Sequence, residues 1–180
     1  MSVIVSGCIL MACNSSSNNN QDSVDSAQNV NDSTNVVTDN TSDFATEAAS
    51  GGMMEVQLGK LAQQNASNPR VKNFGKMMVT DHSKANDELK ALAAKQNIAL
   101  PDSMSNDKKD NMQDLSKKKG SDFDKAYMDM MVDDHKEDIN KFQNAAQNVQ
   151  DTAVKAWAAK ALPVLQKHLD SAQAIQQALK

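Results

Sequence analysis

Two of the three histidines in this sequence occupy the same place in a repeated phrase. The stretch FGKMMVTDHSKANDEL (74–89) and the stretch YMDMMVDDHKEDINKF (127–142) both read as an aromatic residue, two residues, Met-Met-Val, one residue and Asp-His. The repeated histidines are His82 and His135, and the third is His168. Imidazole changes charge near neutral pH and is the commonest protein ligand of transition metals. The phrase therefore points to two chemistries, metal binding and pH sensing.

The elements that must position these residues are predicted to be helices. From residue 43 onward the chain is rich in Ala, Lys, Gln, Leu and Met and poor in β-branched and aromatic residues, a composition that favours helices. Asp43, Asn68 and Ser121 are good N-cap residues, and Pro163 should kink the last helix. The predicted helices span 44–65, 69–96, 106–118, 122–148, and 151 to near the C-terminus.

Each long helix carries a seam of apolar residues at alternating steps of three and four, the spacing that faces neighbouring helices in a bundle. His82, His135 and His168 fall on seam positions, and so does Glu55. Counted from the short loops at about 1.5 Å per residue, the four side chains lie within roughly 10 Å along the bundle axis. One Glu and three His, one from each long helix, are therefore expected to converge in the core.

The connections predict the topology. Loops of a few residues near 66 and 149 require two antiparallel hairpins, whereas the stretch between 96 and 121 is long enough to return along the bundle. A hairpin, a long crossover and a second hairpin make a ferritin-like four-helix bundle with a short crossover helix, in which the two repeated helices are parallel and diagonal. A plain up-and-down bundle is the alternative, but it would have no use for the crossover.

We predict that Glu55, His82, His135 and His168 bind a transition metal. Unpaired polar groups in a dry core cost several kcal/mol, and one metal ion would satisfy all four together. Three imidazoles and a carboxylate suit Zn²⁺, Cu²⁺ or Fe²⁺. The alternative interpretation is that each histidine is a core residue, satisfied by a neighbouring carboxylate or carbonyl, and only fixes the packing.

Three aspartates lie close to the predicted site. Asp81 and Asp134 precede the repeated histidines by one residue and so point about 100° away from them. They are candidate hydrogen-bond acceptors for the imidazoles, or are simply solvated. Asp138, one turn beyond the second repeated histidine, is a possible fifth ligand.

Other neighbours narrow the choice of metal. Di-iron bundles carry Glu-x-x-His motifs, but the residues three before the histidines are Val79, Val132 and Leu165, which disfavours ferroxidase chemistry. Met78 and Met131 lie one turn before the repeated histidines, on the same face, and thioether ligands would favour Cu⁺. Methionine in a bundle core is usually a gap filler, and we interpret both residues in that way.

The N-terminal region is predicted to be a targeting signal followed by a tether. The run MSVIVSGCILMAC ends in Leu-Met-Ala-Cys, which resembles a bacterial lipobox, so residues 1–12 would be removed as a signal peptide and Cys13 would be acylated and anchored to a membrane. Residues 14–42 lack aromatic and basic residues and cannot bury enough apolar surface to become ordered, so 13–42 is predicted to be a disordered tether before a folded domain at 43–180. The formal net charge of −4 offers no basic face for a nucleic-acid partner.

From about residue 44 to 175 the sequence resembles the bacterial family called domain of unknown function 4142 (DUF4142). The resemblance rests on the stretches GGMMEVQLGKLAQQNASNPRVKNFGKMMVTDHSKANDEL, FDKAYMDMMVDDHKEDINKF and ALPVLQKHL. It implies a ferritin-like bundle and a location in the cell envelope, facing the periplasm from the outer membrane, and it implies no activity. The positions that match the recurring polar positions of the family are Glu55, Asp81, His82, Asp134, His135 and His168.

Two functions compete on these grounds. The first is a metal-binding or metal-buffering envelope lipoprotein that uses the Glu/His cluster, without catalysis because no second feature for a substrate is present. The second is a structural or stress-related envelope protein whose histidines only fix the packing. A pH sensor based on buried histidines is a third possibility and predicts loss of helicity near about pH 5–6 without metal dependence.

Overall fold

The structure is a computed structural model that describes residues 21–34 and 39–180. Within these ranges the chain forms helices and no strand, which confirms the predicted all-α bundle. None of the described helices is both long enough and apolar enough to cross a membrane. Cys13 and the predicted signal peptide lie outside the described residues. The helices are α1 (Ser23–Thr34), α2 (Asp39–Asn65), α3 (Pro69–Gln96), α4 (Asn106–Ser116), α5 (Gly120–Asn148) and α6 (Thr152–Ala178).

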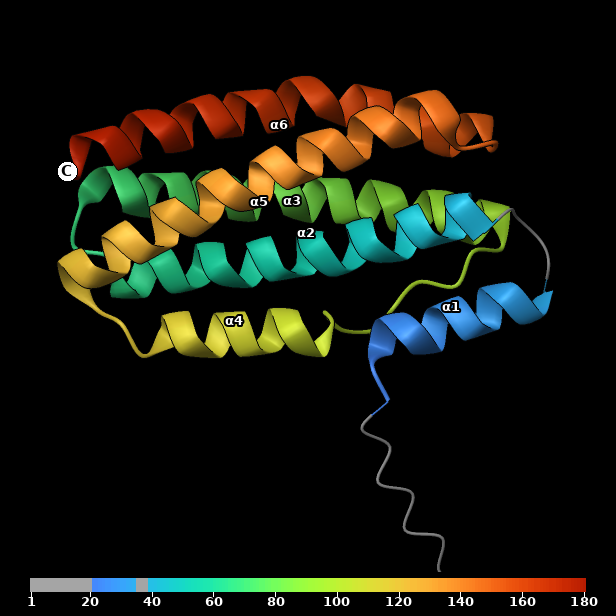
Figure 1. The fold of residues 1–180 in the computed structure, drawn as a ribbon, viewed down its shortest axis with the longest axis horizontal. Helices are drawn as coiled ribbons and strands as arrows, with labels where there is room; N and C mark the ends of the chain where they lie inside the picture. Colours follow the sequence, from blue (N-terminus) through green and yellow to red (C-terminus); the bar gives the residue numbers. More distant parts are fainter. Residues whose placement is uncertain (1–20, 35–38) are drawn as a thin grey trace, which may run out of the picture.

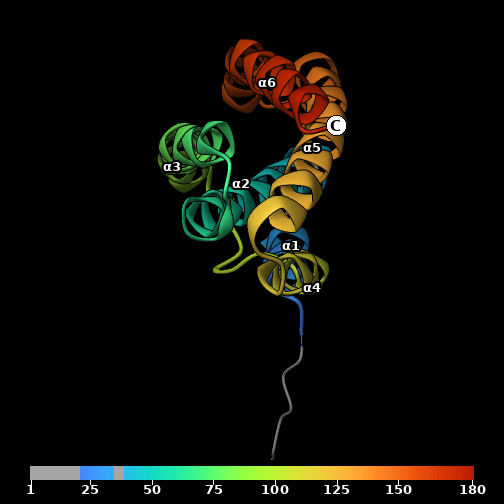
Figure 2. The same cartoon turned by 90° about the vertical axis from the view of Figure 1, so that its left-hand side faces the viewer.

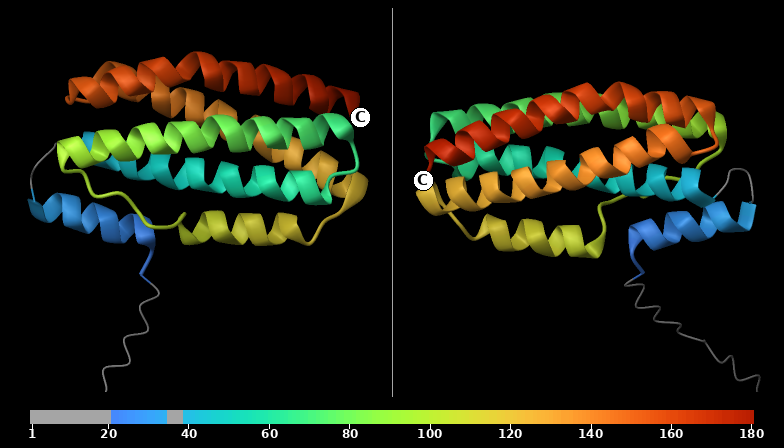
Figure 3. Two further views of the ribbon diagram at one scale, coloured as in Figure 1. Left: turned by 180° about the vertical axis from the view of Figure 1, so that it is seen from behind. Right: turned by 45° about the horizontal axis from the view of Figure 1, so that its top comes forward.

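Four of the helices form two antiparallel hairpins. Helix α2 packs along α3, α5 packs along α6, and the hairpins meet where α2 contacts α5 and α3 contacts α6 (Figures 1 and 2). The connection through α4 returns along the outside of the bundle, so α3 and α5 run in the same direction at diagonal corners (Figure 3). This is the hairpin, crossover, hairpin connectivity predicted from the loop lengths.

The first hairpin is held together by a close approach of two backbones. A Cβ atom added to Gly59 would lie 2.5 Å from the carbonyl oxygen of Gly75, and one added to Gly75 would lie 2.7 Å from the carbonyl oxygen of Gly59. No side chain larger than hydrogen fits at either position without moving the helices apart. The two glycines therefore set the spacing between α2 and α3 directly below the site.

The apolar core consists of two clusters. The larger contains Leu58, Phe74, Met78 and Met131, and the smaller contains Leu89, Ala93, Val154 and Ala158. Along α3, His82 follows the last buried residue of the first cluster and precedes the first buried residue of the second. The polar cluster described below therefore lies between two dry regions of the core.

The loop of the first hairpin is fastened to the second hairpin. The carboxylate of Asp124 on α5 is buried, with 2% exposure, and accepts hydrogen bonds from the backbone N–H groups of Ser67 and Asn68 at 3.0 and 2.9 Å. It also accepts one from the hydroxyl of Ser67. These bonds tie the start of α3 to the start of α5.

The predicted tether differs from the structure. Residues 23–34 form α1, and α2 begins at Asp39 rather than at residue 44. Helix α1 buries Val24 and Ala27, and the buried side chain of Asn31 exchanges two hydrogen bonds with the backbone of Ala99, at 3.0 and 2.7 Å. The segment is too polar to form a core of its own, but it becomes ordered because its polar side chains pair with the backbone of the crossover.

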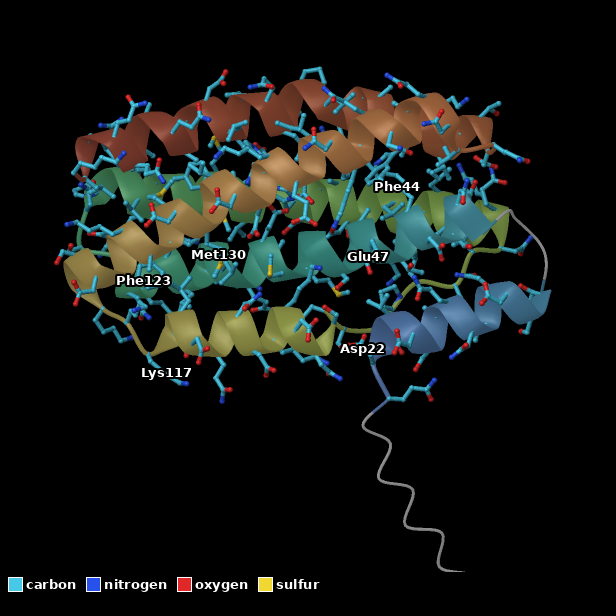
Figure 4. All side chains as sticks on the ribbon, in the orientation of Figure 1. Asp22, Phe44, Glu47, Lys117, Phe123 and Met130 are labelled. Atoms are coloured by element: carbon cyan, nitrogen blue, oxygen red, sulfur yellow. The ribbon has the colours of Figure 1, made fainter. Side chains whose placement is uncertain are left out.

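A single carboxylate joins α1 to α4. Asp22 lies between the facing ends of the two helices (Figure 4). Its Oδ1 accepts from the N–H of Val24 at 2.8 Å and its Oδ2 accepts from the N–H of Asn106 at 2.6 Å. The backbone hydrogen bond to Asn106 lowers the pKa of this carboxyl group. One side chain thus serves the N-termini of two helices on the outside of the bundle.

Most of the predicted helix boundaries agree with the structure within a few residues, and one cap does not. Asn68 caps α3 by accepting from the N–H of Arg70 at 2.8 Å, as predicted. Ser121 does not cap α5: the helix begins at Gly120, which has φ +60°, and Lys119 precedes it without a side-chain cap bond. Helix α6 continues through Pro163 and is bowed rather than interrupted (Figure 1).

Candidate metal centre

Each of the four long helices contributes one polar side chain to a cluster between the two apolar regions. Glu55 comes from α2, His82 from α3, His135 from α5 and His168 from α6, and all four are buried, with exposures of 0–7%. Ligand atoms of the three histidines lie within 4.8 Å of one another. The ring centroids form a triangle with sides of 5.3, 5.3 and 5.8 Å. The structure therefore brings together the residues whose spacing predicted convergence.

His135 has only one nitrogen available to the centre of the cluster. Its Nδ1 lies 2.9 Å from the carbonyl oxygen of Met131, one turn earlier in α5. A carbonyl oxygen can only accept, so Nδ1 carries the proton. Burial lowers the pKa of His135, which keeps the ring neutral and leaves a lone pair on Nε2.

His168 is oriented in the same way by a carboxylate. Its Nε2 donates to Oδ2 of Asp81 at 2.9 Å, so the lone pair of the neutral ring is on Nδ1. Burial lowers the pKa of His168 to about 4, although the hydrogen bond that the ring donates to Asp81 opposes the shift. Asp81 thus acts on the histidine of a neighbouring helix rather than on the histidine that follows it in the sequence.

Three acceptors face one another without a proton between them. Nε2 of His135 lies 3.3 Å from Nδ1 of His168 and 3.5 Å from Oε1 of Glu55, an oxygen that has no hydrogen-bond partner among the described residues. Lone pairs at these distances repel unless a cation lies between them. Two nitrogens bound to one tetrahedral Zn²⁺ at about 2.05 Å would lie about 3.3 Å apart. The spacing of these two nitrogens therefore matches that of two ligands of one metal ion.

His82 and Glu55 form the charged side of the cluster. Nδ1 of His82 lies 2.7 Å from Oε2 of Glu55, and Nε2 of His82 is buried without a partner in the described part of the chain. Burial would raise the pKa of Glu55, but the charge of His82 and its hydrogen bond to Glu55 oppose burial, and the pKa is lowered to about 2. Burial would likewise lower the pKa of His82, but Glu55 outweighs it and raises the pKa. Without a metal, this pair is an ion pair inside the core.

The remaining predicted aspartates occupy different positions. Asp138 is half-buried beside His82, and its pKa is raised to about 8 by burial and by the charge of Glu55. Asp134 bonds to no imidazole, its Oδ2 is buried without a partner among the described residues, and burial together with Glu55 raises its pKa to about 7. The geometry supports hydrogen bonding to a histidine for Asp81 only.

Met78 and Met131 are fully buried members of the larger apolar cluster. This placement agrees with their interpretation as filler. The residue that sequence reasoning missed is Tyr127, whose hydroxyl is buried without a partner in the described chain and whose pKa is raised well above its usual value by burial and by the charges of Glu55 and Asp134. Its only signal in the sequence was its position, which is the aromatic position of the repeated phrase.

The cluster is reached from outside through a pocket of about 310 Å³. Glu55, Asp81, His82, Asp138 and His168 all line it. His135 does not line the pocket, although Asp138 and Phe142 of the same helix do. Of the three histidines, His82 and His168 are thus the two that face the pocket.

Comparison with known proteins places the chain in a family. Neither a curated protein nor a solved structure matches the sequence. The family described as "Domain of unknown function (DUF4142)" matches residues 26–175, a range that begins inside α1 and ends inside α6. The match contains all the residues of the cluster as well as most of the unexpected N-terminal helix, and the chain therefore belongs to the DUF4142 family.

Proposed function

We propose that this protein binds one divalent transition metal ion through His82, His135 and His168, with Glu55 beside the metal. The proposal rests on one observation: the lone pairs of His135 Nε2 and His168 Nδ1 face each other at 3.3 Å with Glu55 Oε1 beside them, all in a buried site. In each histidine, the nitrogen that would not bind the metal donates a hydrogen bond to an oxygen, which is the usual arrangement of metal-bound imidazole. Zn²⁺, Cu²⁺ and Fe²⁺ all suit these ligands.

The proposed role is binding or buffering of the metal rather than catalysis. Three imidazoles leave a fourth position in a tetrahedral Zn²⁺ site, where a bound metal would act as a Lewis acid. The chain's own residues hold the three nitrogens, keep two of the rings neutral and place a carboxylate beside the ion. The alternative is that the cluster only fixes the packing of the helices, and it predicts no response to any metal.

The test is a titration of the purified 180-residue chain with Zn²⁺, Cu²⁺ and anaerobic Fe²⁺, followed by metal analysis and by thermal unfolding. One ion per chain is expected. At a free metal concentration 100 times the dissociation constant, binding stabilises the folded state by about 2.7 kcal/mol, which raises the melting temperature by roughly 5–10 °C for a chain of this size.

Two variants separate a specific site from adventitious binding. His82→Ala combined with His135→Ala should abolish both the stoichiometric ion and the thermal shift. Asp133→Asn changes a carboxylate on the same turn of α5 whose side chain is 79% exposed, and it should leave both unchanged. If no metal raises the melting temperature of the wild-type protein, or if the double variant responds equally, the cluster is structural.

We further propose that the protein acts in the cell envelope, anchored by lipid at Cys13 and facing the periplasm from the outer membrane. The support is the Leu-Met-Ala-Cys sequence that ends the apolar run. Metabolic labelling with a radioactive fatty acid should label the wild-type chain and not Cys13→Ala, whereas Cys8→Ala should still be labelled. Labelling of the Cys13→Ala variant, or none of the wild type, would contradict the anchor.

A further inference from the structure

The pocket that leads to the cluster opens between α3 and α6. Its rim carries the exposed side chains of Lys84, Lys160, Val164 and Lys167, and its floor contains the buried side chains of the cluster. Helices α3 and α6 flank this side of the molecule (Figure 2). At about 310 Å³ the pocket is at the lower end of the range for small-molecule sites, about 300–1,000 Å³. A molecule that enters here reaches His82 and His168 directly.

The walls of the pocket are apolar and partly aromatic. Phe142 and Trp157 lie side by side on the wall, with ring centroids 5.4 Å apart, and the buried Leu165 also lines the pocket. Space for a ligand exists because several lining positions are small, namely Ala48, Ala85 and Ala161. The place of the missing side chain at Gly52 is already filled by Asn86. A pocket with flat aromatic walls and a polar end suits a ligand with an apolar ring and one polar group.

The charged residues at the rim and floor of the pocket indicate which charge the polar group of the ligand carries. Lys160 is paired with Glu88 at 2.9 Å, whereas Lys84 and Lys167 have no ion-pair partner in the described part of the chain. These two ammonium groups attract anions to the entrance. The floor carries the carboxyl groups of Glu55 and Asp81, which oppose an anion unless a metal ion compensates them.

We infer that the pocket binds a small aromatic carboxylate that enters between α3 and α6, places its ring against Phe142 and Trp157 and directs its carboxylate to the metal held by the histidines. The inference rests on the proposed metal site. It adds a ligand class for the open position of the metal, and it makes binding of the organic anion conditional on the ion.

Trp157 provides a direct readout because it is the only tryptophan of the protein and lines the pocket. Benzoate is titrated into the Zn²⁺-loaded and the metal-free protein while the fluorescence of Trp157 is followed. We expect a saturable change with the Zn²⁺-loaded protein and at least tenfold weaker binding without metal. Benzyl alcohol, which has the ring but not the charge, should bind at least tenfold more weakly than benzoate. In the Co²⁺-loaded protein, benzoate should also change the visible absorption spectrum of the ion.

Ala161 lines the pocket and is not one of the proposed metal ligands. Ala161→Phe should therefore fill the pocket and abolish the response to benzoate, while metal analysis still finds one Zn²⁺ per chain. Ala159→Phe is the matched control, because Ala159 is exposed on the same helix and does not line the pocket. Lys84→Glu with Lys167→Glu provides a second test that does not alter the packing, with at least tenfold weaker binding expected. An unchanged response to benzoate in Ala161→Phe, or in the double lysine variant, would overturn the inference.

The experiment also separates the two proposals. If one Zn²⁺ or Co²⁺ binds and benzoate changes neither the fluorescence nor the absorption spectrum, the pocket inference is wrong and the metal site stands. If benzoate binds the metal-free protein as tightly as the loaded one, coordination by the metal is wrong. If no ion binds at all, both proposals fail.

Discussion

The two copies of the repeated phrase give their histidines different surroundings. In the first copy, Nδ1 of His82 pairs with the carboxylate of Glu55, and the charge of this carboxylate outweighs burial and raises the pKa of His82. In the second copy, Nδ1 of His135 donates a hydrogen bond to a backbone carbonyl, and burial lowers the pKa of His135. One ring is therefore charged in the metal-free protein and the other is neutral, although the residues before them are nearly the same.

The difference arises from the neighbouring helices. The first copy lies on α3, which packs along α2, and Nδ1 of His82 lies 2.7 Å from Glu55. The second lies on α5, which packs mainly along α6, and Nε2 of His135 lies 3.5 Å from the same carboxylate. The aspartates differ for the same reason: Asp81 reaches His168 on the adjacent α6, and Asp134 reaches no imidazole. A short repeat can place two rings at one level of a bundle, but the partners on other helices decide their charge.

The largest expected effect is on the stability of the metal-free protein. His82→Leu removes the partner of a buried carboxylate, and we expect a loss of about 3–5 kcal/mol in the free energy of unfolding. His135→Leu removes a neutral ring whose acceptor is a carbonyl of its own helix, and a loss of about 1 kcal/mol is expected. Chemical denaturation of both variants in the presence of a chelator measures the difference. Glu55→Leu combined with His82→Leu should recover most of the larger loss, and equal losses for the single variants would contradict the comparison.

The next effect is on metal affinity, and it separates the two aspartates. Asp81→Asn weakens the hydrogen bond that orients His168, and we expect the affinity for Zn²⁺ to fall about 10–100-fold. Asp134→Asn removes no bond to a ligand, so the affinity should change less than about threefold. Competition with a chromophoric chelator at pH 6 measures both. A larger fall for the variant at 134 would show that the second copy orients its ligand through a contact absent from this structure.

A smaller effect concerns the pH dependence of the metal-free protein. Asp134 has a pKa of about 7 in the folded state, because of burial and the charge of Glu55, against an ordinary value of 3.8. The folded chain therefore keeps a proton that the unfolded chain releases above about pH 4, and this carboxyl group lowers the stability as the pH rises toward 7. Relative to the wild type, Asp134→Asn should become progressively more stable between about pH 4 and pH 7.

Denaturation curves at several pH values in a chelator test this prediction, and Asp133→Asn serves as the control because its side chain is 79% exposed. The control should show no such trend. A constant difference between Asp134→Asn and the wild type across this pH range would mean that the carboxyl group at 134 is already ionised in the folded protein.

The smallest effect is expected at the equivalent methionines of the two copies. Met78→Leu and Met131→Leu keep the volume of the core, so each should cost less than about 1.5 kcal/mol. Neither should change the affinity for Zn²⁺ or for Cu⁺, because both residues belong to the apolar core. Loss of Cu⁺ affinity in either variant, measured under reducing conditions, would make a thioether a ligand.

The convergence of the cluster could be predicted because it depends on helix spacing alone. Residues at steps of three and four share a face, short loops fix the direction of each hairpin, and the depth of a residue follows from its distance to the loop. Glu55 and the three histidines obey these rules. The hydrogen bonding of Asp81 and Asp134 does not follow from these rules. It depends on which side chain of another helix lies within about 3 Å, and helix spacing in the sequence does not determine that.

Two further features were missed for different physical reasons. Helix α1 has the composition of a disordered segment, and it is ordered by bonds from Asp22 and Asn31 to the crossover, which composition does not record. The pocket had a weak signal, because Gly51, Ala85 and Ala161 lie at one level of the predicted bundle and all are small. Small residues on facing helices can bring the helices together or leave space, and only the structure distinguishes the two.

The buried carboxylate of Asp124 has a consequence for the geometry of the ligands. By holding the loop between α2 and α3 against the first turns of α5, it fixes the axial register of one hairpin relative to the other. A slip of one residue would displace the ligands of the two hairpins by about 1.5 Å, whereas metal–nitrogen bonds tolerate only about 0.2 Å. The alignment of the proposed metal ligands thus depends on Asp124, a residue near the loop end of the bundle that is not part of the Glu/His cluster.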